Sequence, residues 1–349
     1  MTILAIDTSC DETAVAVTKA RRIISNELFS QIETHRKWGG VVPNLAKRAH
    51  EERIDGVVES ALKKAKKSME NIDAIAVTYG PGLAIALGVG ITKAQELAKK
   101  YKKKLIPVNH MEGHIYSCFA QDEHEQPTKD FEFPYLVLLV SGGHTELVLF
   151  TDHITYEILG QKLDDAAGEA LDKGARLILE NDIYPGGPML EKMARGGSAT
   201  YIDFPRPMSH SSELNFSFSG LKTSLLYALK KISKEEREAH KNDIAASYQE
   251  AVFDSLCIKL KQAIVKTGVK KLLVAGGVAA NQTLRDKIKN LVEKQKGSVL
   301  FPTFKSLYGD NAAMIGIAGY FRSEKGLFAK NIETVDRVPR ASLDDLEVF

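Results

Sequence analysis

The sequence predicts an α/β protein built from two similar lobes with a cleft between them. Two strand-turn-strand units carry this prediction: one spans residues 2–17, and the other spans residues 135–150. Between them, residues 72–108 alternate as strand, helix and strand, which is typical of a covered and largely parallel sheet. The length of 349 residues exceeds one typical domain and agrees with two lobes.

Composition excludes several classes of protein. With 44% apolar and 26% charged residues, the chain is neither disordered nor fibrous, and a formal charge of +2 alone implies no nucleic-acid partner. Three separated cysteines, Cys10, Cys118 and Cys257, exclude a disulfide framework and suit a reducing compartment. No apolar run reaches the roughly 18 residues of a membrane span. We therefore expect a cytoplasmic protein with no membrane contact.

The first lobe is expected over residues 1–125. Its opening strand, Thr2 to Ile6, is followed by a polar turn, residues 7–13, and a returning strand, Ala14 to Val17. Next come the strand Ile72 to Val77, a Gly80-Pro81-Gly82 turn, the helix Leu83 to Lys100 and the strand Leu105 to Val108. The polar stretch 121–132 marks the expected boundary between the lobes.

The second lobe is expected over residues 126–325. It begins with the second hairpin unit, and residues 161–250 then read mostly as added helices. A strand, a glycine turn and two helices should follow, the last of them near residues 311–325 and returning to the first lobe: Lys271 to Ala275, Gly276 to Asn281, Gln282 to Lys294 and Ala312 to Tyr320. Residues 326–349 form a tail. From Ile332 onward it has little periodicity, and we expect it to be poorly ordered or a docking peptide.

Three turns are candidate nucleotide-binding features. The turns at residues 7–13 and 141–145 place small or hydroxyl side chains where backbone amides can approach an anion. Either alone is as well explained as an ordinary hairpin turn, but paired phosphate-facing hairpins belong to an actin-like ATPase fold. The third turn, Gly276 to Asn281, joins a strand to a helix N-terminus and ends in a polar side chain, which favours nucleotide binding.

A histidine pair is the candidate metal site. His110 and His114 are four residues apart and would share one helical face, and Asp310 is the carboxylate that could complete the set. Two histidines and one carboxylate suit Fe(II) or Zn(II) with open positions. A pair of solvated or core histidines is the usual alternative. A metalloprotease is disfavoured because Glu112 is the second residue after His110, whereas the HExxH motif places glutamate directly after histidine.

Other charged clusters have simpler explanations. Asp165, Glu169 and Asp172 recur at helical spacing, and a Glu169–Lys173 ion pair on a solvated face explains them from periodicity alone. Lysine runs are also usually solvated, although together they could form a patch for an RNA backbone. They occur at residues 63–67, 99–104 and 230–231.

Taken together, the motifs resemble the bacterial branch of the tRNA threonylcarbamoyladenosine transferase family, TsaD, whose members were formerly described as glycoprotein endopeptidases. The resemblance runs from Leu4 to about Tyr320. It rests on these ordered segments: residues 6–13, 39–43, 80–83, 110–114, 139–145, 164–169, 184–188, 216–222, 276–281 and 310–311.

The resemblance implies an actin-like (ASKHA) fold of two lobes with a nucleotide and metal cleft. It also implies transfer of a threonylcarbamoyl group from threonylcarbamoyl-AMP to N6 of adenosine 37, forming t6A in tRNAs that read codons beginning with A. By motif, His110, His114 and Asp310 would hold one divalent metal, Fe(II) before Zn(II). Asp11 and Glu12 are candidates for an acid or base role. The implied substrate contacts are Leu139, Val140, Ser141, Gly142, Gly143, Asp172, Gly187 and Asn281.

The resemblance further implies a paralogous TsaB-type subunit on the first lobe and a TsaE-type ATPase. The small residues of the helix Leu83 to Ala98 offer a pairing face or serve internal packing. Two departures stand out: Asn109 occupies a position where many bacterial members have histidine, and residues 179–183 look altered. A small-metabolite kinase of the same fold and a non-catalytic nucleotide-binding scaffold remain as alternatives, although neither explains the full set of motifs.

Overall fold

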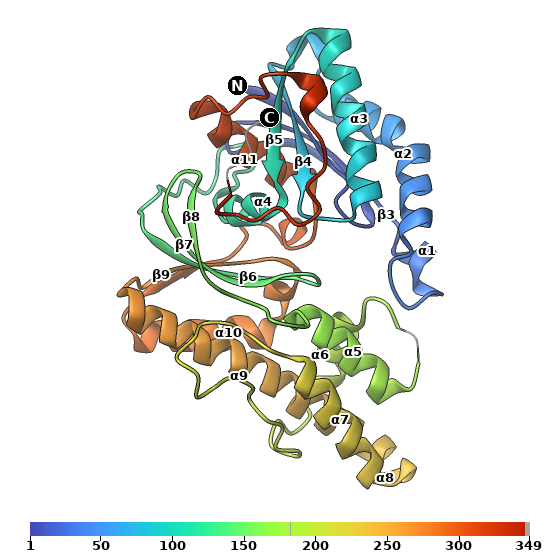
Figure 1. The fold of residues 1–349 in the computed structure, drawn as a ribbon, viewed down its shortest axis with the longest axis vertical. Coiled ribbons are helices and arrows are strands. Elements are labelled where there is room, and N and C mark those ends of the chain that lie inside the picture. Colours follow the sequence, from blue (N-terminus) through green and yellow to red (C-terminus); the bar gives the residue numbers. More distant parts are fainter. Residues whose placement is uncertain (182, 346–349) are drawn as a thin grey trace.

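A computed structural model describes residues 1–181 and 183–345. The first sheet has the strand order β3-β2-β1-β4-β5, in which β1 pairs antiparallel with β2 and parallel with β4. The second sheet has the order β10-β9-β6-β7-β8, with β6 antiparallel to β7 and parallel to β9. The two sheets have the same topology when β1 is matched to β6, β2 to β7, β3 to β8, β4 to β9 and β5 to β10 (Figure 1). The duplicated two-lobe α/β fold predicted from the two hairpin units is confirmed.

The first lobe contains β1 to β5 and its covering helices. Helices α2 and α3 pack on one face of the sheet, and α11 packs on the other. The bounds are β1 Thr2–Asp7, β2 Glu12–Lys19, β3 Arg22–Ser30, α1 Ile32–Arg36, α2 Pro43–Lys64, β4 Ala74–Gly80, α3 Ala84–Tyr101, β5 Lys104–Asn109 and α4 His110–Tyr116. Strands β1 and β4 are buried almost throughout because their residues face covered surfaces on both sides, which explains their continuous apolar runs.

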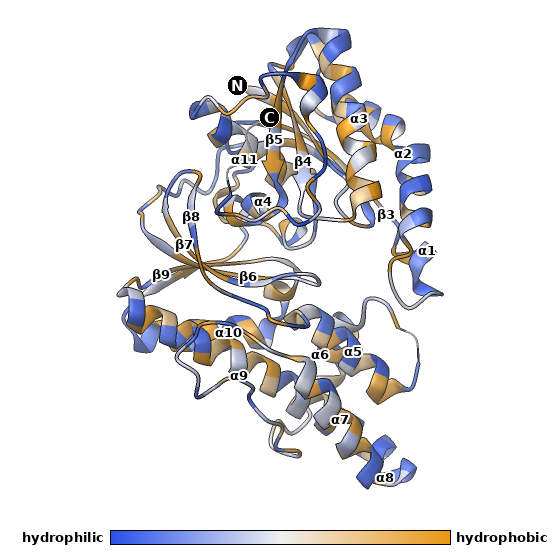
Figure 2. Ribbon diagram, in the orientation of Figure 1, coloured by the Kyte–Doolittle hydropathy of each residue, from blue (hydrophilic) through white to orange (hydrophobic). Residues whose placement is uncertain are grey.

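The second lobe contains β6 to β10 and the helices α5 to α10. The long helix α9 runs across this lobe and packs on α5 and α6 (Figure 1). The bounds are β6 Tyr135–Val140, β7 Thr145–Asp152, β8 Thr155–Gln161, α5 Ala167–Leu179, α6 Gly186–Ala194, α7 Ser219–Lys231, α8 Lys234–Ala239, α9 Lys241–Thr267, β9 Lys271–Ala275, α10 Gln282–Lys294 and β10 Ser298–Leu300. Helix α11, Ala312–Glu324, follows them in the chain and returns to the first lobe, as predicted. Apolar residues line the sheets, whereas the outer helix faces are polar (Figure 2).

A buried core joins the two lobes. It contains Ile3 of β1, Leu139 of β6, Met111 of α4 and Ile317 of α11. The short helix α4 and the helix α11, which comes from near the end of the chain, are therefore packed between the sheets. At its N-terminal side α4 begins where β5 ends. The core therefore fixes the carboxyl ends of parallel strands from both sheets near one place, which is where ligands bind in open α/β sheets.

Two expectations need correction. The tail was predicted to be poorly ordered or a docking peptide, but its described part, residues 326–345, packs on the first lobe of its own chain, with Val335 and Leu343 buried. The tail residues 346–349 lie outside the described residues. The three lysine runs do not form one patch, because the ends of α2 and α3 lie at the top of the molecule and the end of α7 lies at the bottom (Figure 1).

Candidate metal centre and interlobe cavity

Helix α4 presents the histidine pair. Strand β5 ends at Asn109, whose side chain accepts a hydrogen bond from the Met111 amide at 2.9 Å and so caps the helix. The spacing of four residues then brings His110 and His114 onto one face, with ring centroids 4.8 Å apart and the rings nearly perpendicular. Both side chains are buried.

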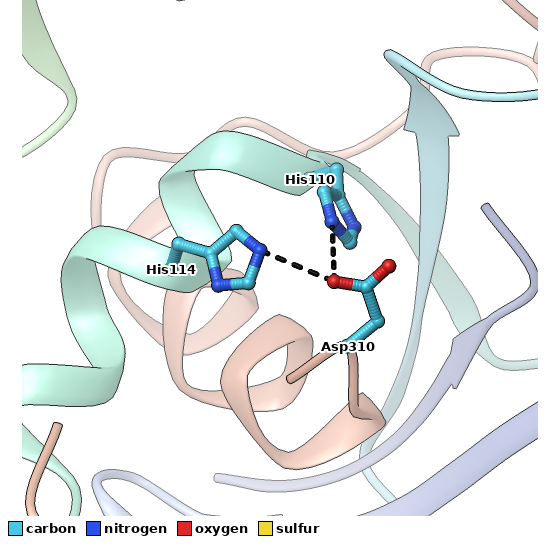
Figure 3. A group of neighbouring side chains, drawn as sticks. All are labelled: His110, His114 and Asp310. Carbon is cyan, nitrogen blue, oxygen red and sulfur yellow. Dashed lines mark ion pairs between the residues drawn. The ribbon is translucent and has the colours of Figure 1, made fainter. Parts of the chain in front are cut away.

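The start of α11 brings Asp310 to the histidines. Asn311 caps that helix by accepting from the Met314 amide at 3.0 Å, and Asp310 directly precedes it. One Asp310 carboxylate oxygen lies 3.2 Å from His110 Nε2 and 3.3 Å from His114 Nε2 (Figure 3). The structure therefore brings together all three residues that were predicted as metal ligands, although Asp310 lies about 200 residues from the histidines in the sequence.

The chemistry of this group fits a divalent metal. His114 is fully buried, and within the described part of the chain neither of its ring nitrogens has a hydrogen-bond partner, since the 3.3 Å approach to Asp310 lacks hydrogen-bond geometry. A buried imidazole without a partner is costly, and a cation between the three side chains would satisfy it. On the far side of His110, Nδ1 lies 3.2 Å from Ser9 Oγ and 3.4 Å from Asp7, the type of outer partner that orients a ligating histidine.

Electrostatics at the group also suit a cation. Burial opposes ionisation of Asp310, but the neighbouring His110 and His114 outweigh burial and hold its pKa well below the usual value. Burial disfavours a charged His110, yet Asp310 and Asp7 raise its pKa well above normal. Burial lowers the pKa of His114. The site thus holds an ionised carboxylate and a neutral imidazole, and a metal ion would replace the proton that the acids stabilise on His110.

A cavity of about 840 Å³ opens beside this group, a volume within the usual range for small-molecule sites. It lies between the two polar turns that were predicted to bind an anion. Among the predicted residues, these line it: Asp11, Glu12, His110, Ser141, Gly142, Gly143, Asp172, Gly187, Asn281 and Asp310. Leu139 and Val140 do not line the cavity, because both are fully buried within β6.

The turn after β6 leaves open backbone toward the cavity. Ser141 Oγ accepts from the His144 amide at 3.1 Å, which tightens the turn. A Cβ atom at Gly142 or Gly143 would meet nothing within 4 Å, so these glycines expose main chain instead of packing it. Unhindered amides of this kind are suited to an anionic group.

Asp172 lies at the cavity wall beside the turn that leads into α6. Its carboxylate accepts from the Gly187 amide at 2.6 Å, which ties α5 to the N-terminus of α6, and burial raises its pKa despite this hydrogen bond. The predicted ion pair between Glu169 and Lys173 also forms, at 2.9 Å, and Lys173 contacts Asp165 as well. Periodicity therefore described the outer side of α5 correctly but missed that Asp172 turns toward the cavity.

Asn281 is a cavity residue with both ends of its amide engaged. Its oxygen caps α10 by accepting from the Leu284 amide at 3.2 Å, and its nitrogen donates to Gln249 at 2.9 Å. The side chain is thereby fixed at the cavity wall.

The two acids of the first turn differ in environment. Asp11 is buried and accepts a hydrogen bond from the Tyr184 hydroxyl, which reaches across from the second lobe, at 3.2 Å. Burial, reinforced by Asp11 and Asp310, raises the pKa of Glu12 well above its usual value. Sequence reasoning assigned no role to Tyr184, and its position within the 184–188 motif is the signal that could have found it. Asp182, in the altered stretch 179–183, lies outside the described residues.

The fold and the site define an actin-like α/β protein with a buried two-histidine, one-carboxylate group beside a nucleotide-sized interlobe cavity. The chain belongs to the TsaD family, tRNA N6-adenosine threonylcarbamoyltransferase, whose family model matches residues 22–317. Relatives of that name include one from Thermosipho africanus, 45% identical over 98% of this chain and 100% of its own, and one from Clostridium beijerinckii, 48% identical over 93% of both chains.

Solved structures agree on the fold. The chain superposes on HypF from T. kodakarensis with a TM-score of 0.61 at 16% identity, over 93% of this chain and 48% of that one. A full-length HypF in a phosphate- and nucleotide-bound form gives the same TM-score at 14% identity. Membership of the tRNA N6-adenosine threonylcarbamoyltransferase family does not favour the small-metabolite kinase or the non-catalytic scaffold. Within the described residues, no helix combines the length and the apolar character that crossing a membrane requires.

Proposed function

We propose that the chain transfers a threonylcarbamoyl group from threonylcarbamoyl-AMP to N6 of adenosine 37 in tRNAs that read codons beginning with A. One observation carries the site assignment: His110, His114 and Asp310 meet at the wall of a nucleotide-sized cavity between two polar turns. The proposed domain division is 1–125, 126–325 and 326–349, and the proposed metal is Fe(II), with Zn(II) as the alternative.

The residues of the second lobe would hold the adenylate. The exposed amides of Gly142 and Gly143 suit its phosphate, with Ser141 beside them at the cavity wall, and Asp172 with Gly187 suits its ribose and adenine. Asn281 would add a contact from the base of α10. When bound by the three ligands, a divalent cation supplies Lewis-acid stabilisation of charge that develops on the acyl phosphate.

The acids of the first turn would serve the attacking amine. In the reaction the adenine N6 bonds to the carbamoyl carbon, the bond from that carbon to the AMP oxygen breaks, and N6 loses a proton. Asp11, oriented by Tyr184, is the proposed acceptor of that proton. Burial and its acidic neighbours raise the pKa of Glu12, which favours the protonated carboxyl, and in that form Glu12 can donate a hydrogen bond near the reacting carbonyl.

Partners and location complete the proposal. tRNA is the acceptor, a TsaB-type subunit would pair with the first lobe, a TsaE-type ATPase would join them, and the complex would act in the cytoplasm. The pairing face on α3 is narrower than the sequence suggested. Gly90 packs against Thr8, and Gly88 against Arg337 of the tail, so these small residues serve internal contacts.

The test is transfer of labelled threonylcarbamoyl from its adenylate to unmodified tRNA, with the partner proteins present. We expect product with wild type, and loss of both product and bound metal in His114→Ala and His110→Ala. His124→Ala is the matched control, because its imidazole is largely exposed in the 121–132 loop and should change nothing. If wild type binds adenine nucleotide but transfers nothing, the scaffold function replaces the proposed one.

A further inference from the structure

The segment that follows α11 wraps the first lobe, and we define residues 331–345 as the strap (Figure 1). Its first part runs along α3. The Gln95 side chain donates to the carbonyls of Ile332 and Val335, each at 2.9 Å, and Lys99 pairs with Glu333 at 2.8 Å. Val335 is only 2% exposed. These contacts anchor the strap far from the metal ligands.

The middle of the strap contacts the turn after β4. The Val338 amide donates to the Tyr79 carbonyl at 2.8 Å, and the Gly82 amide donates to the Pro339 carbonyl at 3.2 Å. Gly80 is pressed against the strap so closely that a Cβ atom there would lie 1.9 Å from the Val338 carbonyl oxygen. Since Gly82 lines the interlobe cavity, the strap forms the outer support of one cavity wall.

The last described part of the strap reaches the metal helix. Asn109 donates from Nδ2 to the Ser342 carbonyl at 3.0 Å, while its Oδ1 caps α4. Its side-chain amide thus joins the strap to the helix whose first residue is His110. Leu343 is 4% exposed and enters the core that contains Met111 of α4 and Met314 of α11. The strap therefore contacts α4, which carries both histidines, and α11, which begins just after Asp310.

We propose that the strap is a positioning element of the active site, acting through Gly80 on the cavity wall and through Asn109 on His110. It does not contact substrate. Rather, it holds the N-terminus of α4 and the Gly80-to-Gly82 turn in the arrangement that binds metal and adenylate. The inference rests on the proposed metal-binding role of His110, His114 and Asp310.

Two variants disturb the strap without removing it. Gly80→Ala places a methyl group where the Val338 carbonyl of the strap lies. The three atoms nearest to that methyl group all belong to the strap residues Val338 and Ala341. Asn109→Ser keeps an oxygen acceptor suited to a helix cap but is too short to reach Ser342. Gly56→Ala is the matched control, because a Cβ there meets nothing within 4 Å on the exposed side of α2.

The readouts are Co²⁺ affinity by spectroscopic titration and the KM for threonylcarbamoyl-AMP against kcat in the assembled complex. We expect both strap variants to bind Co²⁺ about 10-fold more weakly, the order of effect that follows when the orientation of a metal ligand is disturbed from outside its first shell, and to raise KM, whereas Gly56→Ala matches wild type.

The outcomes separate the strap from the proposed function. If wild type binds Co²⁺ tightly and both strap variants bind it equally well, with only a lower melting temperature, the strap is a stability feature and the inference is wrong. If wild type itself binds no Co²⁺, the proposed metal site fails first.

Discussion

A buried ion pair fixes α4, which carries both histidines, to α11, which begins just after Asp310, and its removal gives a quantitative test of the packing. Arg322 of α11 donates from Nη1 to both carboxylate oxygens of Glu112, at 2.9 and 3.0 Å, and each side chain is only 2% exposed. Glu112 lies between His110 and His114 on α4. Burial raises the pKa of Glu112, and Arg322 offsets only part of that effect, so the pair does not fully compensate its desolvation.

The cost of breaking the pair should therefore exceed the net contribution of the pair. Glu112→Met leaves a buried guanidinium that cannot lose its proton, which should lower the free energy of unfolding by about 3–5 kcal/mol. Arg322→Met should cost less, because the stranded carboxyl of Glu112 can take up a proton. The double variant Glu112→Met/Arg322→Met should lie within about 1–2 kcal/mol of wild type, or above it.

Urea denaturation of the metal-free protein near pH 7, followed by circular dichroism, measures these differences through the shift in midpoint. The coupling energy from the double-mutant cycle should be several kcal/mol. A double variant that loses the sum of the two single losses would refute the reasoning, as would a loss under about 1 kcal/mol in Glu112→Met. Either result would mean that the charges are solvated in solution.

Two further predictions concern stability. Burial, and then Asp344 of the strap, raises the pKa of Glu146 from 4.5 to about 7. Between these two values the folded state holds a proton on Glu146 that the unfolded state releases. The buried carboxyl therefore does not reduce the free energy of unfolding below about pH 4.5, and it reduces that free energy increasingly as the pH rises to about 7. Glu146→Gln should unfold like wild type at pH 4.5 but be more stable by up to about 3 kcal/mol at pH 8 in urea titrations, and equal stability at both pH values would contradict this. Gly174→Ala would place a methyl group 2.3 Å from the Tyr248 ring and should cost about 1–3 kcal/mol by the same measurement, whereas Gly220→Ala, which meets nothing within 4 Å, should be neutral or stabilising.

The sequence was most informative where a local pattern repeats or has a fixed period. The two hairpin units are enough to predict the duplicated sheets, because each pairs an apolar strand with a polar turn at the same relative position. The histidine spacing predicts one helical face because 3.6 residues form a turn. These are properties of neighbouring residues, and tertiary contacts reinforced them.

What sequence reasoning missed depends on long-range contacts. The strand Arg22–Ser30 was not predicted because it is only partly buried and carries polar residues; one of them, Asn26, accepts from the Ala313 amide at 3.2 Å, a contact across almost the whole chain. The strap has little period of its own because, apart from two tight turns, its main chain bonds to the first lobe. Asp172 turns inward because α6 docks on α5, which no helical period reports.

The duplication also explains why the metal ligands are so far apart in sequence. His110 begins directly after β5, the last strand added to the first sheet, and Asp310 follows β10, which holds the equivalent place in the second sheet. Equivalent strand ends from the two lobes therefore supply the two kinds of ligand to one point, with α4 and α11 packed in the shared core behind them. Asp310 directly precedes the N-cap of α11, and α11 returns to pack on the first sheet and on α4. Metal affinity should accordingly report how α11 packs on α4, because any shift between these two helices alters the 3.2 and 3.3 Å approaches between the histidines and Asp310 before it disturbs either sheet.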